Sequence, residues 1–342
     1  MRTLTVAQAI REALREEMLR DEAVFLMGED IGIFGGPFGV TTGLIEEFGE
    51  ERIRDTPISE TGFIGAAVGA ALTGMRPVVE VQYSDFITCA MDQVVNQAAK
   101  MRFISGGQLK VPLVIRAPVG ATGRGAQHAQ SPYAWFMHCP GLKVVAPSSP
   151  YDAKGLLKSA IRDDNPVMFF EHKFLYGSRS VGSPEERSRK EPTEAFAPYE
   201  SIPTEEYTIP LGKADIRKDG KDVTVIANLL MVHKALRAAN VLHDQGIDVE
   251  VIDLRSFVPL DKQSIIDSVK KTGRAVVVDE GARTCGIGAE IAAVISEEVI
   301  DYLDAAIVRV TALDTPVPFS PVLESRVIPD ENRIAEAIKK IL

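Results

Sequence analysis

The chain has 342 residues, 45% of them hydrophobic and 25% charged, and its formal net charge is −10. This length predicts about two domains, with cores large enough to fold without a disulfide or a structural metal. The acidic balance argues against binding to nucleic acid or to an anionic membrane, since both need a basic surface, and no apolar run is long enough to span a membrane.

The first half of the chain alternates helical patterns with short apolar runs. A helix is predicted from Val6 onwards, because Thr5 and Gln8 have the spacing of a capping box and apolar residues recur every fourth position. Buried strands are predicted at 23–28, 76–81, 112–118, 142–148 and 166–172, and further helices at 60–73, 89–103 and 150–163. Strands that alternate with helices predict a mainly parallel sheet covered on both faces.

The alternation stops after Tyr176, where a segment rich in Ser, Pro, Glu and Arg follows. We predict a linker over 181–206 that joins a first domain, 1–180, to a second domain, 207–342. Strands are predicted in the second domain at 222–228, 248–254, 274–280 and 305–312, and helices at 231–246, 261–273, 288–301 and 331–342. The predicted fold class is therefore α/β, with two α/β domains and mainly parallel sheets.

Several common motifs can be set aside. The sequence contains no Walker A loop, no H-E-x-x-H and no G-x-S-x-G. The segment CGIGAEI (285–291) resembles a dinucleotide fingerprint, but it lacks the third small residue and lies well beyond the preceding strand. The three cysteines show no C-x-x-C spacing, and the N-terminal segment lacks the apolar core of a signal peptide, so we expect a cytoplasmic protein.

Glu60 stands at the start of a helical segment made almost entirely of small apolar residues, and Ser59 before it is the predicted N-cap. Three glycines share one face of this helix and predict close packing against a large group or another backbone: Gly62, Gly65 and Gly69. Glu60 has two interpretations. It is either a partner of the helix dipole, which is common, or a functional acid in apolar surroundings that raise its pKa.

Two further groups of residues suggest a site. The segment VQYSDF (81–86) directly follows a strand, at the end where open α/β sheets bind ligands, although its aromatic residues are equally typical of a core. His128 lies between two glutamines in a turn-rich loop, where an imidazole titrates near neutrality and exchanges protons. A histidine in such a loop is equally typical of a hydrogen-bonding scaffold, and His138 has the character of a structural residue.

These signals occur together in one family. Its motifs are recognised in order along nearly the whole chain as FLMGEDIG (25–32), DTPISETGFIGAAVGAA (55–71), DQVVNQAAKMRF (92–103), HCPGLKVVAPSSPYDAKGLLKSAIRDDNPV (138–167), FFEHKFLYG (169–177) and TPVPFSP (315–321). The chain resembles the beta subunit of the thiamin-diphosphate-dependent dehydrogenase component of 2-oxo acid dehydrogenase complexes. The resemblance implies a pyrimidine-binding domain followed by a transketolase-type C-terminal domain.

The resemblance also assigns roles to residues. It implies that the Glu60 carboxylate hydrogen-bonds the aminopyrimidine of thiamin diphosphate and activates the cofactor. Phe86 is implied to pack on that ring with Gln82 beside it, and His128 to assist acyl transfer to a lipoyl group. A structural potassium ion is implied as well, bound through main-chain carbonyl groups at Leu113, Ala160, Ile161, Asp163 and Asn165.

A missing motif points to a partner. Enzymes of this class hold the cofactor's diphosphate through magnesium on a G-D-G motif, and this sequence contains none. The resemblance therefore implies an alpha subunit that holds the magnesium and shares the cofactor in a heterotetramer of two alpha and two beta subunits. It also implies that a dihydrolipoyl acyltransferase core docks on the C-terminal domain. An acidic face could take part there, or simply be solvated: Glu290, Glu297, Glu298 and Asp301.

The expected activity is oxidative decarboxylation of a 2-oxo acid such as pyruvate, or cleavage of acetoin, with acyl transfer to the lipoyl group. Gln127 before His128 is typical of the pyruvate and acetoin types, and VVVDEGARTC (276–285) resembles the acetoin type. Three alternatives stay open. They are a branched-chain 2-oxo acid dehydrogenase beta subunit, a noncatalytic assembly subunit of such a complex, and the C-terminal half of a split transketolase-like enzyme.

Overall fold

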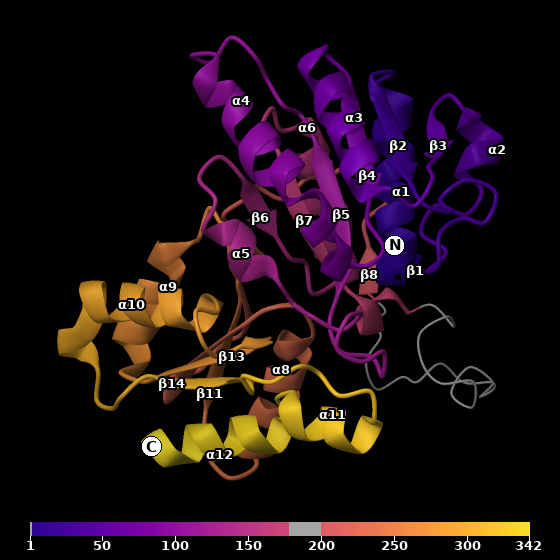
Figure 1. Cartoon of the computed structure of the whole chain (residues 1–342). Helices are drawn as coiled ribbons and strands as arrows, with labels where there is room; N and C mark the ends of the chain where they lie inside the picture. The colour runs from indigo at the N-terminus through magenta and orange to yellow at the C-terminus, as the bar shows by residue number, and fades with distance from the viewer. Residues whose placement is uncertain (1, 178–199) are drawn as a thin grey trace.

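The computed structural model describes residues 2–177 and 200–342, which form two sheets surrounded by helices (Figure 1). The strands of the first part are β1 (Arg2–Leu4), β2 (Val24–Gly28), β3 (Ile53–Asp55), β4 (Arg76–Glu80), β5 (Val114–Val119), β6 (Lys143–Val145) and β7 (Val167–His172). Its helices are α1 (Val6–Arg20), α2 (Leu44–Phe48), α3 (Glu60–Leu72), η1 (Ser84–Ala90), η2 (Gln93–Ala98), α4 (Ala99–Ile104), α5 (Tyr133–Met137), α6 (Pro150–Arg162) and η3 (Lys173–Tyr176).

The second part repeats this plan. Its strands are β8 (Glu200–Ile202), β9 (Asp215–Lys218), β10 (Val223–Ala227), β11 (Val249–Asp253), β12 (Ser256–Val258), β13 (Ala275–Ala282) and β14 (Val308–Ala312). Its helices are α8 (Leu229–His243), α9 (Lys262–Thr272), α10 (Ile287–Val299), η4 (Ile300–Tyr302), α11 (Pro321–Val327) and α12 (Glu331–Ile341). None of the described helices is both long enough and apolar enough to cross a membrane.

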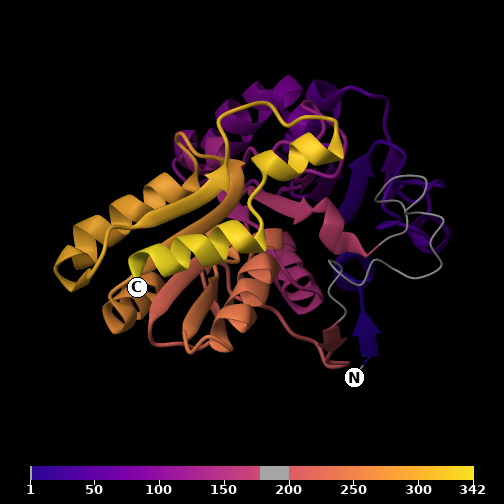
Figure 2. The same ribbon diagram turned by 90° about the horizontal axis from the view of Figure 1, so that it is seen from below.

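Both large sheets are mainly parallel, which confirms the predicted α/β fold class. The first has the strand order β12-β6-β7-β5-β4-β2-β3 and the second β14-β13-β10-β11-β9, and only the edge strands β12 and β9 run antiparallel to their neighbours. Helices α9 and α10 cover one face of the second sheet, while α8 and α12 cover the other (Figure 1). Figure 2 shows α12 lying along the outside of this domain.

Helix α1 shows how local sequence sets an element. Thr5 and Gln8 form the predicted capping box: the Gln8 N–H donates to the Thr5 hydroxyl oxygen at 3.2 Å, and the Thr5 N–H donates to the Gln8 side chain at 2.9 Å. The apolar stripe of the helix, which includes Ile10 and Leu14, is buried. This stripe holds α1 against the sheet and α6.

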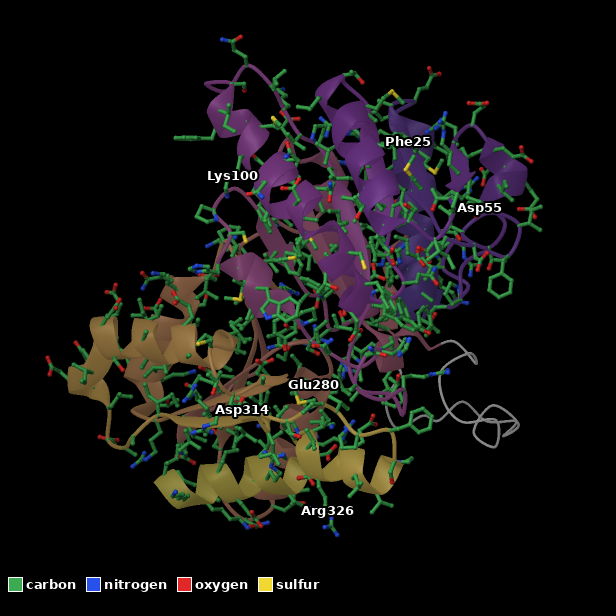
Figure 3. All side chains as sticks on the ribbon, in the orientation of Figure 1. Phe25, Asp55, Lys100, Glu280, Asp314 and Arg326 are labelled. Atoms are coloured by element: carbon green, nitrogen blue, oxygen red, sulfur yellow. The ribbon has the colours of Figure 1, made fainter. Side chains whose placement is uncertain are left out.

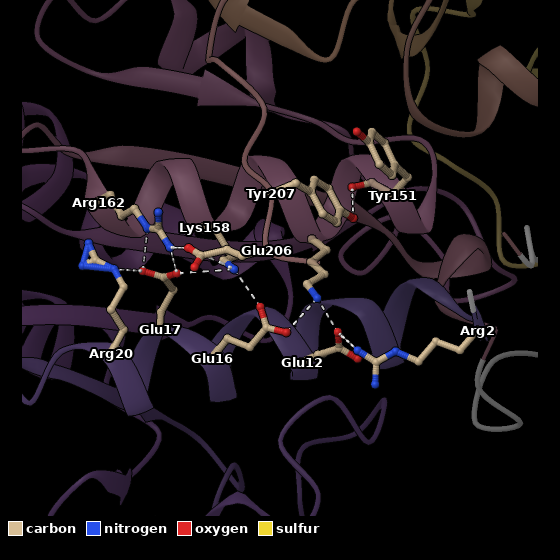
Figure 4. Close-up of polar contacts among 11 residues, drawn as sticks. Arg2, Glu12, Glu16, Glu17, Arg20, Tyr151, Lys158, Arg162, Glu206 and Tyr207 are labelled. Atoms are coloured by element: carbon tan, nitrogen blue, oxygen red, sulfur yellow. Dashed lines mark hydrogen bonds and ion pairs between the residues drawn. The ribbon is translucent and has the colours of Figure 1, made fainter. Parts of the chain in front are cut away.

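A network of charges also joins α1 to α6 (Figure 4). Lys154 and Lys158 on α6 are almost fully buried, and each ammonium group lies 2.7 Å from a Glu16 carboxylate oxygen on α1. One turn further along, Arg162 binds Glu17 at 2.7 Å. Each buried cation therefore has a carboxylate partner, which is the condition under which such charges are tolerated in a core.

The two domains are not cleanly separate. Most of the predicted linker, 181–206, lies outside the described residues, but its end forms β8, which pairs with β1 of the first domain. In addition, β12 leaves the second domain and pairs with β6 of the first sheet. The apolar cores join as well, because buried side chains of both sheets belong to the same packed clusters.

Two local predictions hold only in part. The segment 89–103 is helical, as predicted, but it is not α-helical throughout, since it begins in the 3₁₀ turns of η1 and passes through the wider π-type turns of η2 before α4 begins at Ala99. Ser59 stands at the N-cap position of α3, but its side chain makes no capping hydrogen bond. Both places lie where α3 packs against η1 and η2.

Candidate active site

The candidate site lies at one edge of the first sheet. Strands β2, β4 and β5 are parallel neighbours, so their C-terminal ends meet there. Glu29 follows β2, Gln82 and Phe86 follow β4, and His128 lies in the loop after β5. Glu60 joins them as the first residue of α3, whose start is tied to η1 by a hydrogen bond from the Thr61 hydroxyl to the Cys89 carbonyl. The predicted ligand-binding edge thus holds every predicted catalytic or cofactor-binding residue.

Glu60 is the most enclosed of these carboxylates, with 8% of its surface exposed. Within the described part of the chain, no hydrogen bond reaches its carboxylate, although its charge acts on Glu29. The backbone behind it is satisfied, because the Ser59 carbonyl accepts the N–H groups of Gly62 and Phe63 at 2.9 and 3.0 Å. Glu60 is therefore a buried acid whose acceptor oxygens are available to a ligand.

Glu29 is the main residue at the site that sequence reasoning did not single out. Burial, the neighbouring charge of Glu60 and that of Asp30 raise the pKa of Glu29 to about 7. One of its carboxyl oxygens, Oε1, is buried without a hydrogen-bond partner among the described residues. Two carboxyl groups that share one site cannot both ionise easily, so Glu29 keeps its proton to a higher pH than an ordinary glutamate does. The sequence signal that could have identified Glu29 is its position directly after the strand β2.

Gln82 is fixed by hydrogen bonds to both sides. Its amide nitrogen donates to the Glu29 main-chain oxygen at 3.2 Å and to the Glu80 carboxylate at 2.9 Å. Glu80 in turn binds the buried Arg116, which also forms two bonds of 2.7 Å with Glu171. Burial lowers the pKa of Arg116, but the two carboxylates outweigh it and raise that pKa overall. This ion cluster supports Gln82 from beneath the sheet edge.

Phe86 and His128 meet directly. Their rings pack edge to face with centroids 5.4 Å apart, and the Tyr83 ring contacts His128 in the same way at 5.8 Å. Both His128 and Phe86 are half-buried, so part of each ring is accessible. The structure thus brings His128 beside the aromatic residue expected to pack on the cofactor.

Lys173, which the sequence did not single out, supports this group from η3. Its ammonium group donates a hydrogen bond to the His128 carbonyl and lies 4.6 Å from the centre of the Tyr83 ring. Burial lowers the pKa of Lys173 to about 8, although the charges of Asp85 and Glu280 act in the opposite direction. Only the three-dimensional fold reveals this lysine, because in the sequence it is one basic residue after a strand.

The residues expected to bind potassium lie at the opposite edge of the same sheet. Leu113 precedes β5, Ala160 and Ile161 belong to the last turn of α6, and Asp163 and Asn165 lie between α6 and β7. They form one cluster around the helix C-terminus, where main-chain carbonyl groups collect. This cluster lies where the N-terminal ends of the parallel strands meet. It is therefore separate from the site around Glu60, which lies at their C-terminal ends.

A guanidinium group already contacts this carbonyl cluster. Arg76 donates to the main-chain oxygens of Ile161 at 2.9 Å and Asp163 at 3.1 Å. The carbonyls of Leu113 and Ala160 accept backbone N–H groups. Each carbonyl oxygen has two lone pairs, so an oxygen that accepts one hydrogen bond can still coordinate a cation. The carbonyl cluster therefore fits a cation in part, because the Arg76 guanidinium already brings a positive charge there.

The small-residue face of α3 is packed over its first half. A Cβ atom at Gly62 would lie 2.9 Å from the Ser59 hydroxyl and one at Gly65 would lie 3.4 Å from the Gln93 side chain of η2, whereas one at Gly69 would meet nothing within 4 Å. Among the described residues, close neighbours are therefore present at Gly62 and Gly65 but not at Gly69. The four acidic residues of the C-terminal domain are exposed, as predicted, on α10 and η4: Glu290, Glu297, Glu298 and Asp301.

Comparison with known proteins gives a consistent result. Residues 2–178 match the model of the transketolase pyrimidine-binding domain, and residues 212–334 match that of the transketolase C-terminal domain. A solved structure of a split-gene transketolase, an inactive beta4 tetramer, has a TM-score of 0.76 at 23% identity and covers 99% of this chain and 98% of its own. At that identity the likeness concerns the fold.

Several named proteins are much more similar in sequence. Pyruvate dehydrogenase E1 component subunit beta of Rickettsia felis is 48% identical over 99% of this chain and 98% of its own. Acetoin:2,6-dichlorophenolindophenol oxidoreductase subunit beta of Bacillus subtilis is 44% identical over 100% and 98%, and 2-oxoisovalerate dehydrogenase subunit beta of the same species is 43% identical over 100% and 99%. The chain therefore belongs to the family formed by the beta subunits of pyruvate, acetoin and 2-oxoisovalerate dehydrogenases, built from the two transketolase-type domains.

Proposed function

We propose that this chain is the beta subunit of a thiamin-diphosphate-dependent dehydrogenase that oxidises a 2-oxo acid such as pyruvate, or cleaves acetoin. One observation carries the proposal: the Glu60 carboxylate is buried, free of hydrogen bonds within the described chain, and set at the sheet edge with Gln82 and Phe86. The names of its relatives support the same reaction class. The three unpaired cysteines fit a reducing, cytoplasmic setting.

The residues present fit the aminopyrimidine half of thiamin diphosphate. When bound, this cofactor supplies a nucleophilic carbon that attacks the substrate's carbonyl group. Glu60 would accept a hydrogen bond from the aminopyrimidine ring and take up that proton at its carboxylate, while Phe86 would offer an aromatic face to the same ring. His128, whose ring packs against Phe86, serves the later transfer of the acyl group to lipoamide.

A Glu60→Gln variant tests the catalytic role. With its alpha subunit present, we expect the variant to lose at least about 100-fold in activity, because an amide cannot take up the proton. Glu46→Gln is the matched control, since Glu46 also lies in the first turn of a helix but is exposed and remote from the site. Full activity in the Glu60 variant would instead favour a noncatalytic assembly subunit.

The alpha subunit is part of the proposal, because the chain has no G-D-G motif for the diphosphate and its magnesium. Exposed apolar side chains lie next to the site and support a subunit interface there. Ile33, Phe34 and Ile58 are 85%, 70% and 84% exposed, and the 32–58 region is held together by a bond of 2.7 Å from the Gly32 N–H to Asp55. Sedimentation of the mixed subunits should give a heterotetramer of two alpha and two beta subunits.

The C-terminal domain is proposed to dock the dihydrolipoyl acyltransferase core. Its exposed acidic residues support an electrostatic contact, which added salt weakens. Replacing Glu297 and Glu298 together by glutamine should weaken binding to the acyltransferase and leave activity with an artificial electron acceptor unchanged. Equal binding by the variant would mean that this face is simply solvated.

The potassium site is a proposal that its carbonyl cluster supports. A bound cation raises the melting temperature of the folded state that holds it. We therefore expect the chain to melt at a higher temperature in potassium chloride than in choline chloride at equal ionic strength. Equal melting temperatures would show that the Arg76 guanidinium is the only cation that the carbonyls of Ile161 and Asp163 require.

The substrate is proposed to be pyruvate or acetoin. Gln127 supports this choice over a branched-chain 2-oxo acid, although the relatives of all three kinds are similar in identity, at 48%, 44% and 43%. The reconstituted enzyme should be assayed with pyruvate, acetoin and 2-oxoisovalerate in parallel. A clear preference for 2-oxoisovalerate would replace the proposed substrate and leave the reaction class intact.

A further inference from the structure

We propose that Glu324 and Glu280 of the C-terminal domain are positioning residues for His128. They hold the loop of residues 120–130, in which His128 lies, by accepting hydrogen bonds from its backbone N–H groups. The proposal rests on the function proposed above for His128 in acyl transfer.

Glu280 binds the start of this loop. Its Oε1 atom accepts the Ala121 N–H at 2.6 Å, and its Oε2 atom lies 2.7 Å from Nε2 of His172, the last residue of β7. His172 Nδ1 accepts the Phe174 N–H at 3.2 Å, so Nε2 carries the proton and donates it to Glu280. Figure 3 shows Glu280 where the two domains meet. The buried Glu280 carboxylate of the second domain is therefore anchored by His172 of the first domain, and it fixes a loop of the first domain.

Glu324 binds the next part of the loop from α11. Both of its carboxyl oxygens accept the Gly123 N–H, at 2.9 and 3.1 Å. Two residues further on, Gly125 lies against Phe319, since a Cβ atom there would be 3.2 Å from the phenyl ring. The segment before and within α11 thus lies along the loop and contacts it twice.

Lys173 fixes the other end, where it donates to the His128 carbonyl. The loop contains three glycines with positive φ: Gly120, Gly123 and Gly125. Glycine backbones are conformationally free, so such a loop depends on outside contacts for a single conformation. The two carboxylates from the second domain supply these contacts on the side of the loop before His128.

Loss of the Glu324 anchor should therefore displace His128 rather than unfold the protein. A displacement of about 1 Å at a reacting group costs up to 100-fold in rate, and we expect about tenfold here because Glu280 and Lys173 remain. Only steps that use His128 should slow. Reduction of a dye that accepts electrons directly, such as 2,6-dichlorophenolindophenol, bypasses the lipoyl group and should be unaffected.

The experiment compares Glu324→Leu, Glu324→Gln and His128→Ala in the reconstituted enzyme, by lipoyl-domain acylation and by dye reduction. Glu324→Leu should slow acylation alone, whereas Glu324→Gln, which keeps an oxygen acceptor for the Gly123 N–H, should restore most of the rate. Glu336→Leu is the matched control, because Glu336 is exposed on the neighbouring helix α12. Melting temperatures identify any variant that folds poorly.

The double variant His128→Ala/Glu324→Leu gives the sharpest readout. If Glu324 acts through His128, the double variant acylates at the rate of His128→Ala alone. A full additional loss in the double variant, or an equal loss of dye reduction in Glu324→Leu, would overturn the positioning role. Unchanged acylation in His128→Ala would instead remove the role proposed for the histidine itself, so the two failures are distinguishable.

Discussion

Glu29 makes the candidate site sensitive to pH. Its pKa of about 7 in the folded chain is above the ordinary value of 4.5, so the folded state binds this proton more tightly than the unfolded state does. The resulting contribution is fully present at low pH and is lost as the pH rises from about 4.5 through about 7. Because the group is partly exposed, we discount the shift for solvent screening to about 1 kcal/mol.

A Glu29→Gln variant should remove this dependence. We expect its free energy of unfolding to exceed that of the wild type by about 1 kcal/mol more at pH 8 than at pH 5, since an amide carries no charge next to Glu60. Urea unfolding of the chain without a partner measures the difference. The exposed Glu46→Gln change should alter the free energy of unfolding by the same amount at both pH values. If the effect of Glu29→Gln were also independent of pH, the proposed coupling between Glu29 and Glu60 would be refuted.

The sequence could identify the chemical groups of the site but not their supports. Glu60 and His128 each had an ordinary interpretation, and only the family motifs gave them a common role. Lys173 and Glu324 could not be found in this way, because their importance depends on burial and on contacts made across large sequence separations. Whether a charged side chain is exposed or enclosed is decided by packing, which periodicity does not report.

At the scale of elements, sequence patterns succeeded where one local signal dominates. The capping box and apolar stripe of α1 gave both its start and its buried face. Over 89–103 they gave a helix but not its geometry, because the backbone changes there from 3₁₀ to π to α turns. This segment packs against α3, and such contacts are invisible before the chain is folded.

The buried charges between α1 and α6 lead to a prediction about these elements. A Lys154→Met change leaves the carboxylates of Glu12 and Glu16 without their buried partner, whose side chain is 1% exposed. Losing one member of a buried pair costs about 3–5 kcal/mol, and we expect the lower end because Glu16 keeps Lys158 as a second partner. Chemical unfolding of both proteins measures the change.

Lys110→Met is the matched control, because Lys110 also forms an ion pair, 2.7 Å from Asp164, but its side chain is 61% exposed. Exposed pairs contribute about 0–1 kcal/mol, so this variant should be nearly as stable as the wild type. High salt should reduce the small effect at Lys110 and leave the effect at Lys154 in place. Equal losses in the two variants would mean that burial of the network contributes nothing.

At the scale of the whole molecule, composition and alternation were enough to predict two α/β domains, but not how they join. β12 is only three residues long, and nothing in its sequence shows that it will pair with β6 of the other domain. The Phe257 side chain of this strand is 2% exposed and packs against Tyr133 of the first domain, with ring centroids 5.0 Å apart. Strand pairing and core packing therefore couple the two domains.

This coupling predicts that the chain unfolds in a single thermal transition, although chains of two domains often show two. A Phe257→Ala change removes the aromatic ring that links the cores, at a cost of about 3–5 kcal/mol, and should separate the transition into two. Phe25→Ala is the matched control, since Phe25 is a buried strand residue on the far side of the first domain from the second (Figure 3). That variant should melt at a lower temperature in one transition. Differential scanning calorimetry of the chain without a partner distinguishes these outcomes, and a single sharp transition in Phe257→Ala would show that β12 is not what makes the domains unfold together.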